Sequence, residues 1–262
     1  MKAIRILVLV ILAVVVSKSG FGQNEKWTWY YGNPTVYCTA IQGDTVWAGT
    51  QIGLFAIDRK TGEKIAHYYK NNSEFPYAGI NTIVLDNKGN KWIATGGSGL
   101  VMFDGEKFII YNKSNSGLPS DHVLSIAIDK EGNKWVGTDC KGLVKFDGIN
   151  WTVYDNNSGL LDNEIISIVI DNDGYKWIST WNEGIAKFDN KNWTIYNTNN
   201  SGLPENNIRS LVIDKKGNKW IATDGKGLVK FDGINWTVYN ENNSGLPDDF
   251  VLSIAIDNEG NK

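Results

Sequence analysis

The residues best suited to bind a ligand are a tryptophan followed by an amide and a carboxylate, Trp181-Asn182-Glu183. An indole ring can stack on a sugar ring, while amide and carboxylate groups hydrogen-bond to its hydroxyls. The alternative is that Trp181 packs over a neighbouring loop and the charged groups are solvated. Comparable positions elsewhere in the sequence can add polar contacts: Asp139, Lys141, Asp224 and Lys226.

The sequence gives little support for catalysis or for a cofactor. His67 and His122 occupy unrelated positions, and no Ser-His-Asp set, metal cluster or pair of acids can be assembled. "DNDG" at 171–174 is interpreted as a turn, because the later ligands of a calcium loop are missing. The net charge is −3, and no basic run alternates with aromatic residues, so nucleic acid is not expected as a partner.

Cys38 and Cys140 are the only cysteines in the sequence. The first is expected in a strand and the second in a loop of another repeat. A disulfide cannot be argued from two cysteines alone. We expect two free thiols.

These candidate residues belong to a repeat of about 43 residues. One tryptophan recurs in every copy, and a second aromatic residue follows it in all copies but the first. The first set is Trp47, Trp92, Trp135, Trp177 and Trp220, and the second is Phe108, Trp151, Trp193 and Trp236.

One repeat, residues 123–154, shows four short runs rich in β-branched and aromatic residues. Gly, Asn or Asp residues bound each run, which is typical of strands. "DKEG" suits a type I turn and "FDGIN" contains Asp-Gly, so neighbouring strands are expected to be antiparallel. The runs are Val123–Ile128, Lys134–Thr138, Gly142–Phe146 and Trp151–Tyr154.

Four-stranded sheets repeated at this period predict an all-β fold, a β-propeller whose sheets stack as blades around an axis. The recurring aromatic residues are then structural. We expect wedges between blades at Trp47, Trp92, Trp135, Trp177, Trp220, Trp151, Trp193 and Trp236.

The blades are expected to start near residues 36, 80, 123, 165 and 208, and an incomplete blade near 251 begins with a strand over Val251–Ile256. Trp27–Tyr30 resembles the fourth strand of a repeat and would complete the last blade of a closed ring. We therefore expect five full blades plus parts of a sixth, in a fragment of a six- or seven-bladed ring.

The first 22 residues resemble a secretory signal peptide, which leaves residues 23–262 for the propeller. Lys2 and Arg5 accompany an apolar block, Ile4–Val16, that is short for a membrane span, and small residues follow up to Gly22. An uncleaved anchor is the alternative. We expect export to the periplasm or the exterior, with a membrane contact only through a further C-terminal part.

The unit "GLP-x(4)-V-x-S-I-x-x-D-x-x-G-N-x-W-V/I-x-T-x-x-x-G-L-x-x-F-D", seen over 117–147 and 202–232, resembles the two-component regulator propeller repeat. The first copy departs most, because it lacks the Asp-x-x-Gly-Asn joint. The resemblance implies an exported, non-catalytic sensor domain, as in hybrid histidine kinases of Bacteroidetes, with a small-molecule or glycan ligand. A secreted scaffold or adhesion propeller is one alternative, and a streptogramin-lyase-like enzyme is another. The oligomeric state stays open.

Alternating strand directions place two kinds of connection on each rim of the propeller. The connections between second and third strands vary from copy to copy, and they share a rim with the long connections between repeats. Variable loops on a rigid scaffold are where binding is usually found. We therefore expect the ligand at this rim, which carries Trp181.

Overall fold

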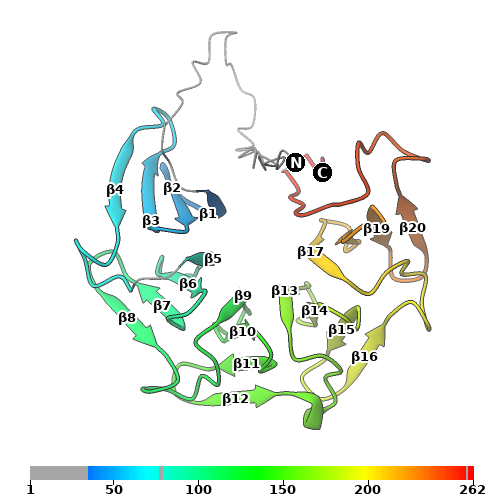
Figure 1. The fold of residues 1–262 in the computed structure, drawn as a ribbon, viewed down its shortest axis with the longest axis horizontal. Helices are drawn as coiled ribbons and strands as arrows, with labels where there is room; N and C mark the ends of the chain where they lie inside the picture. The colour runs from blue at the N-terminus through cyan, green and yellow to red at the C-terminus, as the bar shows by residue number, and fades with distance from the viewer. Residues whose placement is uncertain (1–34, 77–78, 258) are drawn as a thin grey trace, which may run out of the picture.

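The structure is a computed structural model that describes residues 35–76, 79–257 and 259–262. These residues form five antiparallel sheets of four strands, in which sequential strands are neighbours. Figure 1 shows the sheets placed one after another around an axis, with the first strand of each sheet innermost and the fourth outermost. The predicted all-β propeller fold is confirmed.

Each sheet is one blade, numbered in chain order. Blade 1 contains β1 (Val36–Gln42), β2 (Thr45–Thr50), β3 (Gly53–Asp58) and β4 (Lys64–Tyr68). Blade 2 contains β5 (Ile80–Leu85), β6 (Lys91–Thr95), β7 (Leu100–Phe103) and β8 (Phe108–Tyr111). Blade 3 contains β9 (Val123–Ile128), β10 (Lys134–Thr138), β11 (Leu143–Phe146) and β12 (Trp151–Tyr154).

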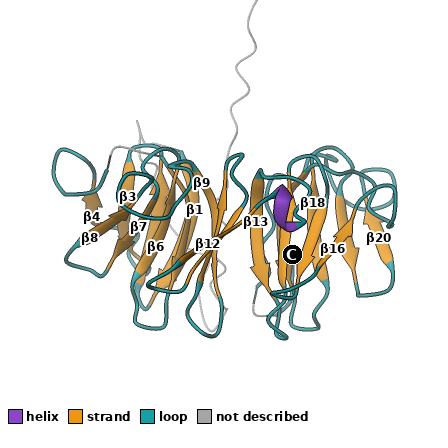
Figure 2. Ribbon diagram, turned by 90° about the horizontal axis from the view of Figure 1, so that it is seen from below, coloured by secondary structure: helices purple, strands orange, loops and turns teal. Residues whose placement is uncertain are grey.

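The 3-10 turn η1 (Asn156–Ser158) connects blades 3 and 4. Blade 4 contains β13 (Ile165–Ile170), β14 (Lys176–Thr180), β15 (Ile185–Phe188) and β16 (Trp193–Tyr196). Blade 5 contains β17 (Ile208–Ile213), β18 (Lys219–Thr223), β19 (Leu228–Phe231) and β20 (Trp236–Tyr239). Loops gather at the two rims, as Figure 2 shows from the side.

The prediction of a strand over Val251–Ile256 is wrong: these residues form no strand. A strand needs a hydrogen-bonded neighbour, and no described segment pairs with this one as the second strands pair in blades 1 to 5. The segment is held instead by the Val251 N–H, which donates to the Thr223 carbonyl of blade 5 at 3.2 Å. The expected signal peptide and the Trp27–Tyr30 strand lie outside the described residues.

The Asp-x-x-Gly-Asn motif forms the turn between the first and second strands of a blade, and its aspartate hydrogen-bonds to the tryptophan of the second strand. In blade 3, the Trp135 indole N–H donates to Asp129 Oδ2 at 2.8 Å, and Asn133 donates its backbone and side-chain N–H groups to the same carboxylate. The same indole–carboxylate bond recurs in blades 2, 4 and 5. The motif therefore closes the turn and orients the ring that packs against the next blade.

The second-strand tryptophans are buried, with exposed fractions of 0% at Trp135 and 9% at Trp220, and those of blades 1 to 4 meet a phenylalanine of the next blade edge-on. Trp135 meets Phe188 of blade 4 edge-on, with ring centroids 6.1 Å apart. The fourth-strand aromatics are only half-buried. Trp151, for example, stacks on Phe146 of its own blade at 4.1 Å. Burial of these rings joins the blades through the hydrophobic effect.

Within the described ranges, no helix has the length and apolar character needed to cross a membrane.

Candidate functional site

Each innermost strand contains a β-bulge at its second residue. In β1, for instance, Val36 pairs with Thr50 and Cys38 with Gly49, so the residue between them is skipped. A bulge leaves one residue out of the ladder and redirects its side chain, and bulges are common beside binding sites. The skipped residues are Tyr37, Asn81, Leu124, Ile166 and Arg209.

All five bulge residues line one cavity of about 290 Å³ on the propeller axis. Because the innermost strands start at the rim with the variable loops, the bulges place this cavity at that rim. The third residues of the innermost strands add hydroxyl groups to its wall. Those that line it are Thr82, Ser125, Ser167 and Ser210, joined by Ser253.

Some polar groups of this wall also connect neighbouring blades. The Asn81 amide donates to the Val123 carbonyl at 2.7 Å, and the Thr82 hydroxyl donates to the Leu124 carbonyl at 3.1 Å. The Ser125 hydroxyl donates to the Ile165 carbonyl at 3.3 Å. These bonds fix the wall, so the cavity is formed before any ligand arrives.

A second axial cavity of about 440 Å³ adjoins the first and has an aliphatic wall. Ile126 and Ile168 line both cavities. The axis is therefore polar near the variable rim and apolar toward the other rim. The aliphatic wall includes Val84, Leu85, Ile128, Val169, Ile170, Val212 and Ile213.

The variable loops between second and third strands are anchored at both ends. In blade 3, the buried Thr138 hydroxyl donates to the Gly142 carbonyl at 2.7 Å. Gly142 has φ +80, and a Cβ there would lie 2.2 Å from the Tyr154 carbonyl oxygen, so only glycine fits. The Thr and Gly positions of the repeat thus hold the loop, and the three residues between them are free to differ.

Trp181, in the loop of blade 4, lies against blade 5. The Arg209 guanidinium sits over its ring, 4.4 Å from the centroid, and the Trp181 backbone N–H donates to the Glu164 carbonyl at 3.3 Å. The ring is half-buried rather than exposed as the sequence reading required. Trp181 therefore packs against blade 5, close to the alternative in which it packs over a neighbouring loop. Through Arg209 it also lies beside the polar cavity.

Arg209 joins Trp181 to Asp224. Its Nε donates to Asp224 Oδ1 at 2.7 Å, and Nη2 lies 2.7 Å from the same oxygen. The two side chains are 35% and 17% exposed, so this is a partly desolvated, charge-assisted pair. Of the residues selected from the sequence, Trp181 and Asp224 are thus brought together, by an arginine that was not selected.

The other selected residues spread along the rim. Asn182 is exposed, and its backbone N–H donates to Asp162 Oδ2 at 2.9 Å. Glu183 is half-buried, and its backbone N–H donates to the Thr180 hydroxyl at 3.1 Å. Lys141 and Lys226 are exposed and lie in the loops of blades 3 and 5.

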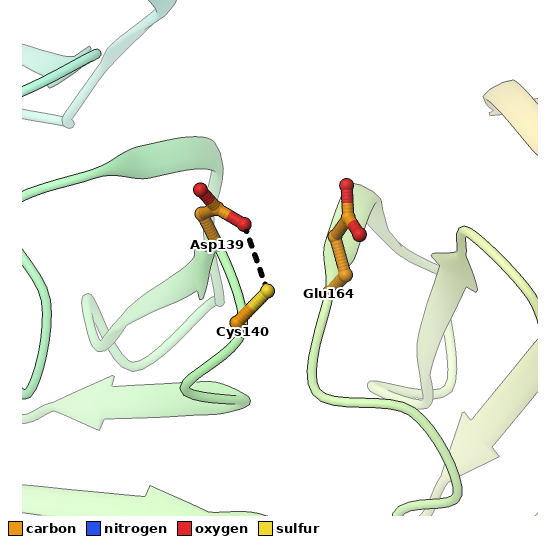
Figure 3. Close-up of side chains that lie close together, drawn as sticks. All are labelled: Asp139, Cys140 and Glu164. Carbon is orange, nitrogen blue, oxygen red and sulfur yellow. Dashed lines mark hydrogen bonds between the residues drawn. The ribbon is translucent and has the colours of Figure 1, made fainter.

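Asp139 belongs to an acidic group between blades 3 and 4. Figure 3 shows Asp139 and Cys140 on one loop facing Glu164 on the connection to the next blade. One ligand atom from each residue lies within 4.8 Å of the other two. The Cys140 thiol donates to Asp139 Oδ1 at 3.0 Å, and this bond raises the pKa of Cys140 to about 11, assisted by desolvation and by the neighbouring acids. The thiol is therefore protonated at neutral pH, and Cys38 is also free.

Glu205 places a further carboxylate beside Asp224. Desolvation and then the charge of Asp224 raise the pKa of Glu205 above its usual value. Its Oε2 atom is buried without a hydrogen-bond partner in the described part of the chain. Buried polar atoms are normally hydrogen-bonded, so this oxygen is an acceptor with unused capacity.

Sequence reasoning missed the bulge residues and the hydroxyls beside them. A signal was present, because the repeat unit contains V-x-S-I, in which the residue before serine changes from copy to copy. The alternation of apolar and polar residues in this unit predicts a regular strand without a bulge. The bulge that turns the variable residue toward the axis becomes visible only with the pairing register.

Known proteins share the repeat and the fold. Residues 117–140 and 202–225 match the family described as Two component regulator propeller. No curated protein sequence matches the chain.

Solved structures share the fold with low sequence identity. The extracellular domain of a protein described as a hybrid two component system from B. thetaiotaomicron is 22% identical with a TM-score of 0.66, over 87% of this chain and 37% of that one. A second such domain from B. thetaiotaomicron is 20% identical with a TM-score of 0.72, over 88% and 32%. Virginiamycin B lyase from Staphylococcus aureus is 12% identical with a TM-score of 0.64, over 78% and 69%.

The chain spans about a third of the length of the two extracellular domains. At these identities, the likeness shows the propeller fold. The chain is thus a β-propeller in which two segments, 117–140 and 202–225, are similar to repeats of the two component regulator propeller family.

Proposed function

We propose that the chain is an exported, non-catalytic propeller that binds a neutral carbohydrate as the sensory part of a signalling protein. The observation that carries this proposal is that Arg209, which lines the polar axial cavity, contacts both Trp181 and Asp224. The matched repeats and the fold shared with extracellular domains of hybrid two component systems support the sensory role. The signal-like sequence up to Gly22 supports export to the periplasm or exterior.

The chemistry of the cavity suits a hydroxylated ligand. Serine and threonine hydroxyls and the Asn81 amide line its wall, and Arg209 supplies N–H donors. The exposed part of the Trp181 ring offers an apolar surface for the C–H face of a sugar.

The charge balance favours a neutral sugar over an anion. Asp224 already pairs with Arg209, and this pair uses two of the five N–H donors of the guanidinium. Glu205 adds further acidity nearby. An anionic ligand would meet these carboxylates, whereas a neutral sugar can donate to them and accept from Arg209.

The arrangement of the histidines supports binding without catalysis. His67 lies in β4 on the outer edge of blade 1, and His122 directly precedes β9 in blade 3. Neither lines the polar cavity. A catalytic centre at this cavity would have to work without a histidine base.

A glycan array followed by calorimetric titration tests the proposal. The intact chain is expected to bind a neutral sugar, and Trp181→Ala is expected to weaken binding by about tenfold, because one stacking contact contributes about 1.4 kcal/mol. Ile234→Ala is the control, since Ile234 is 85% exposed in a turn on the opposite rim. Unchanged affinity in Trp181→Ala would remove this residue from the site, and no binding by any neutral glycan would contradict the carbohydrate proposal.

A further inference from the structure

The bulge positions vary in chemistry on a scaffold that is nearly constant. The residue before each bulge is always Val or Ile, and the residue after it is small and carries a hydroxyl or thiol. The preceding residues are Val36, Ile80, Val123, Ile165 and Ile208, and the following ones are Cys38, Thr82, Ser125, Ser167 and Ser210. Within the innermost strands, variation in chemistry is concentrated at residues that face the cavity, which indicates a role in recognition rather than in folding.

One part of this ring of bulge residues is polar. Tyr37 of blade 1 is 54% exposed, and Asn81 of blade 2 follows it around the axis. One Asn81 side-chain N–H is already used by the Val123 carbonyl, which leaves the second N–H and the amide oxygen for a ligand. Arg209 of blade 5 lies on the other side of the ring and is fixed by Asp224. These groups are suited to the hydroxyls of a sugar.

The part between them is apolar. Leu124 and Ile166 are half-buried, and they occupy β9 and β13, whose blades are neighbours. A ligand hydroxyl placed against these two side chains would lose its hydrogen bonds to water without replacement, which costs about 1–3 kcal/mol. A methyl group at the same place would be favoured by burial.

We propose that the bulge residues select the ligand of the axial cavity, and that Leu124 and Ile166 receive a methyl-bearing substituent of the sugar. This inference rests on the proposed function and names its ligand class more closely. The methyl group can belong to a 6-deoxy sugar or to an N-acetylamino sugar. Both sources present the same chemistry to the apolar part of the ring.

Calorimetric titration of the full chain with matched sugars tests the inference. The probes are glucose and galactose, their 6-deoxy analogues and their N-acetylamino analogues. At least one methyl-bearing analogue is expected to bind about fourfold or more tightly than its parent hexose, as burial of one methyl predicts. The analogue that shows this gain identifies the source of the methyl group.

Ile166→Thr replaces a methyl-bearing branch by a hydroxyl while keeping the β-branched shape that a strand prefers. It is expected to abolish the preference for the methyl-bearing analogue over its parent hexose. Ile109→Thr is the matched control, because Ile109 lies in the outer strand β8 and is 44% exposed. Leu124→Thr provides a second variant if Ile166→Thr has a lowered melting temperature.

Two outcomes distinguish this inference from the function on which it rests. If hexoses bind but no methyl-bearing analogue binds more tightly, or if both threonine variants keep the preference, the inference is wrong and the proposed function stands. If no probe sugar binds the unmodified chain, the inference is wrong, and the glycan array then decides whether the proposed function stands.

Discussion

The Lys176 ammonium lies 4.4 Å from the centroid of the Trp135 ring, across the boundary between blades 3 and 4. Lys176 begins the second strand of its blade and is 3% exposed. Its Nζ also donates to Asn190 Oδ1. The same inter-blade contact recurs between Lys91 and Trp47, Lys134 and Trp92, and Lys219 and Trp177.

This contact should appear as an energetic coupling between blades. Burial lowers the pKa of Lys176, so desolvation of the ammonium opposes its attraction to the ring, and a single substitution mixes both effects. A double-mutant cycle with Lys176→Met and Trp135→Leu separates them. Urea unfolding is expected to give a coupling free energy of about 0.5–2 kcal/mol. A cycle with the exposed Lys191→Met is the control, and additive effects of Lys176→Met and Trp135→Leu would contradict the contact.

The aspartates that begin the Asp-x-x-Gly-Asn turns should make the free energy of unfolding depend on pH in the acidic range. Burial by itself would raise the pKa of Asp214, but hydrogen bonds from Trp220, Asn218 and backbone N–H groups lower it to about 2. A folded-state pKa below the unfolded value of about 4 means that the ionised carboxylate stabilises the folded state above about pH 4. This contribution is lost as the pH falls from about 4 through about 2.

Asp214→Asn is therefore expected to be less stable than the unmodified chain at pH 7, and the difference in unfolding free energy should shrink as the pH approaches about 2. Urea unfolding across this range measures it. Asp173→Asn, at an exposed position, is the matched control and should show no such convergence. A difference that stays constant with pH would contradict the assigned role of the Asp214 carboxylate.

Cys140 should react slowly despite its exposure. Its pKa of about 11 follows mainly from the hydrogen bond to Asp139, and the thiolate is the reactive form. Asp139→Asn is expected to speed alkylation by iodoacetamide at pH 8, by about tenfold for each unit by which the pKa falls. Asp162→Asn should have a smaller effect, because Asp162 acts only through its charge. Alkylation of Asp139→Asn at the original rate would show that this bond does not control the thiol.

The repeat made the architecture predictable, because strand alternation, Asp-x-x-Gly turns and recurrent tryptophans all favour the same blade. Val251–Ile256 shows the limit of this reasoning. Its alternation equals that of β9, yet a strand exists only where a partner supplies hydrogen bonds. The alternation of residues in a segment indicates only its propensity to form a strand. Whether the strand forms depends on a neighbouring strand that pairs with it.

The site was predictable only in part. Trp181 could be selected because no other copy of the repeat has a tryptophan in this loop. The position of the variable loops on one rim could be predicted from the alternating directions of the strands. Arg209 could not be found in this way, because its contacts with Trp181 and Asp224 join two blades and depend on the bulge in β17. The register of pairing, rather than composition, turns Arg209 and Ile166 toward the same cavity.

Hydrogen–deuterium exchange with and without a bound neutral sugar tests the central claim most directly, that the ligand occupies the axial cavity at the variable rim. Slower exchange is expected in segments 164–168, 181–184 and 207–211, which contain the bulges of blades 4 and 5 and the Trp181 loop. The turns of the opposite rim, 171–174 and 214–217, should be unchanged. Protection confined to those turns, or spread over the outer strands β16 and β20, would contradict the account.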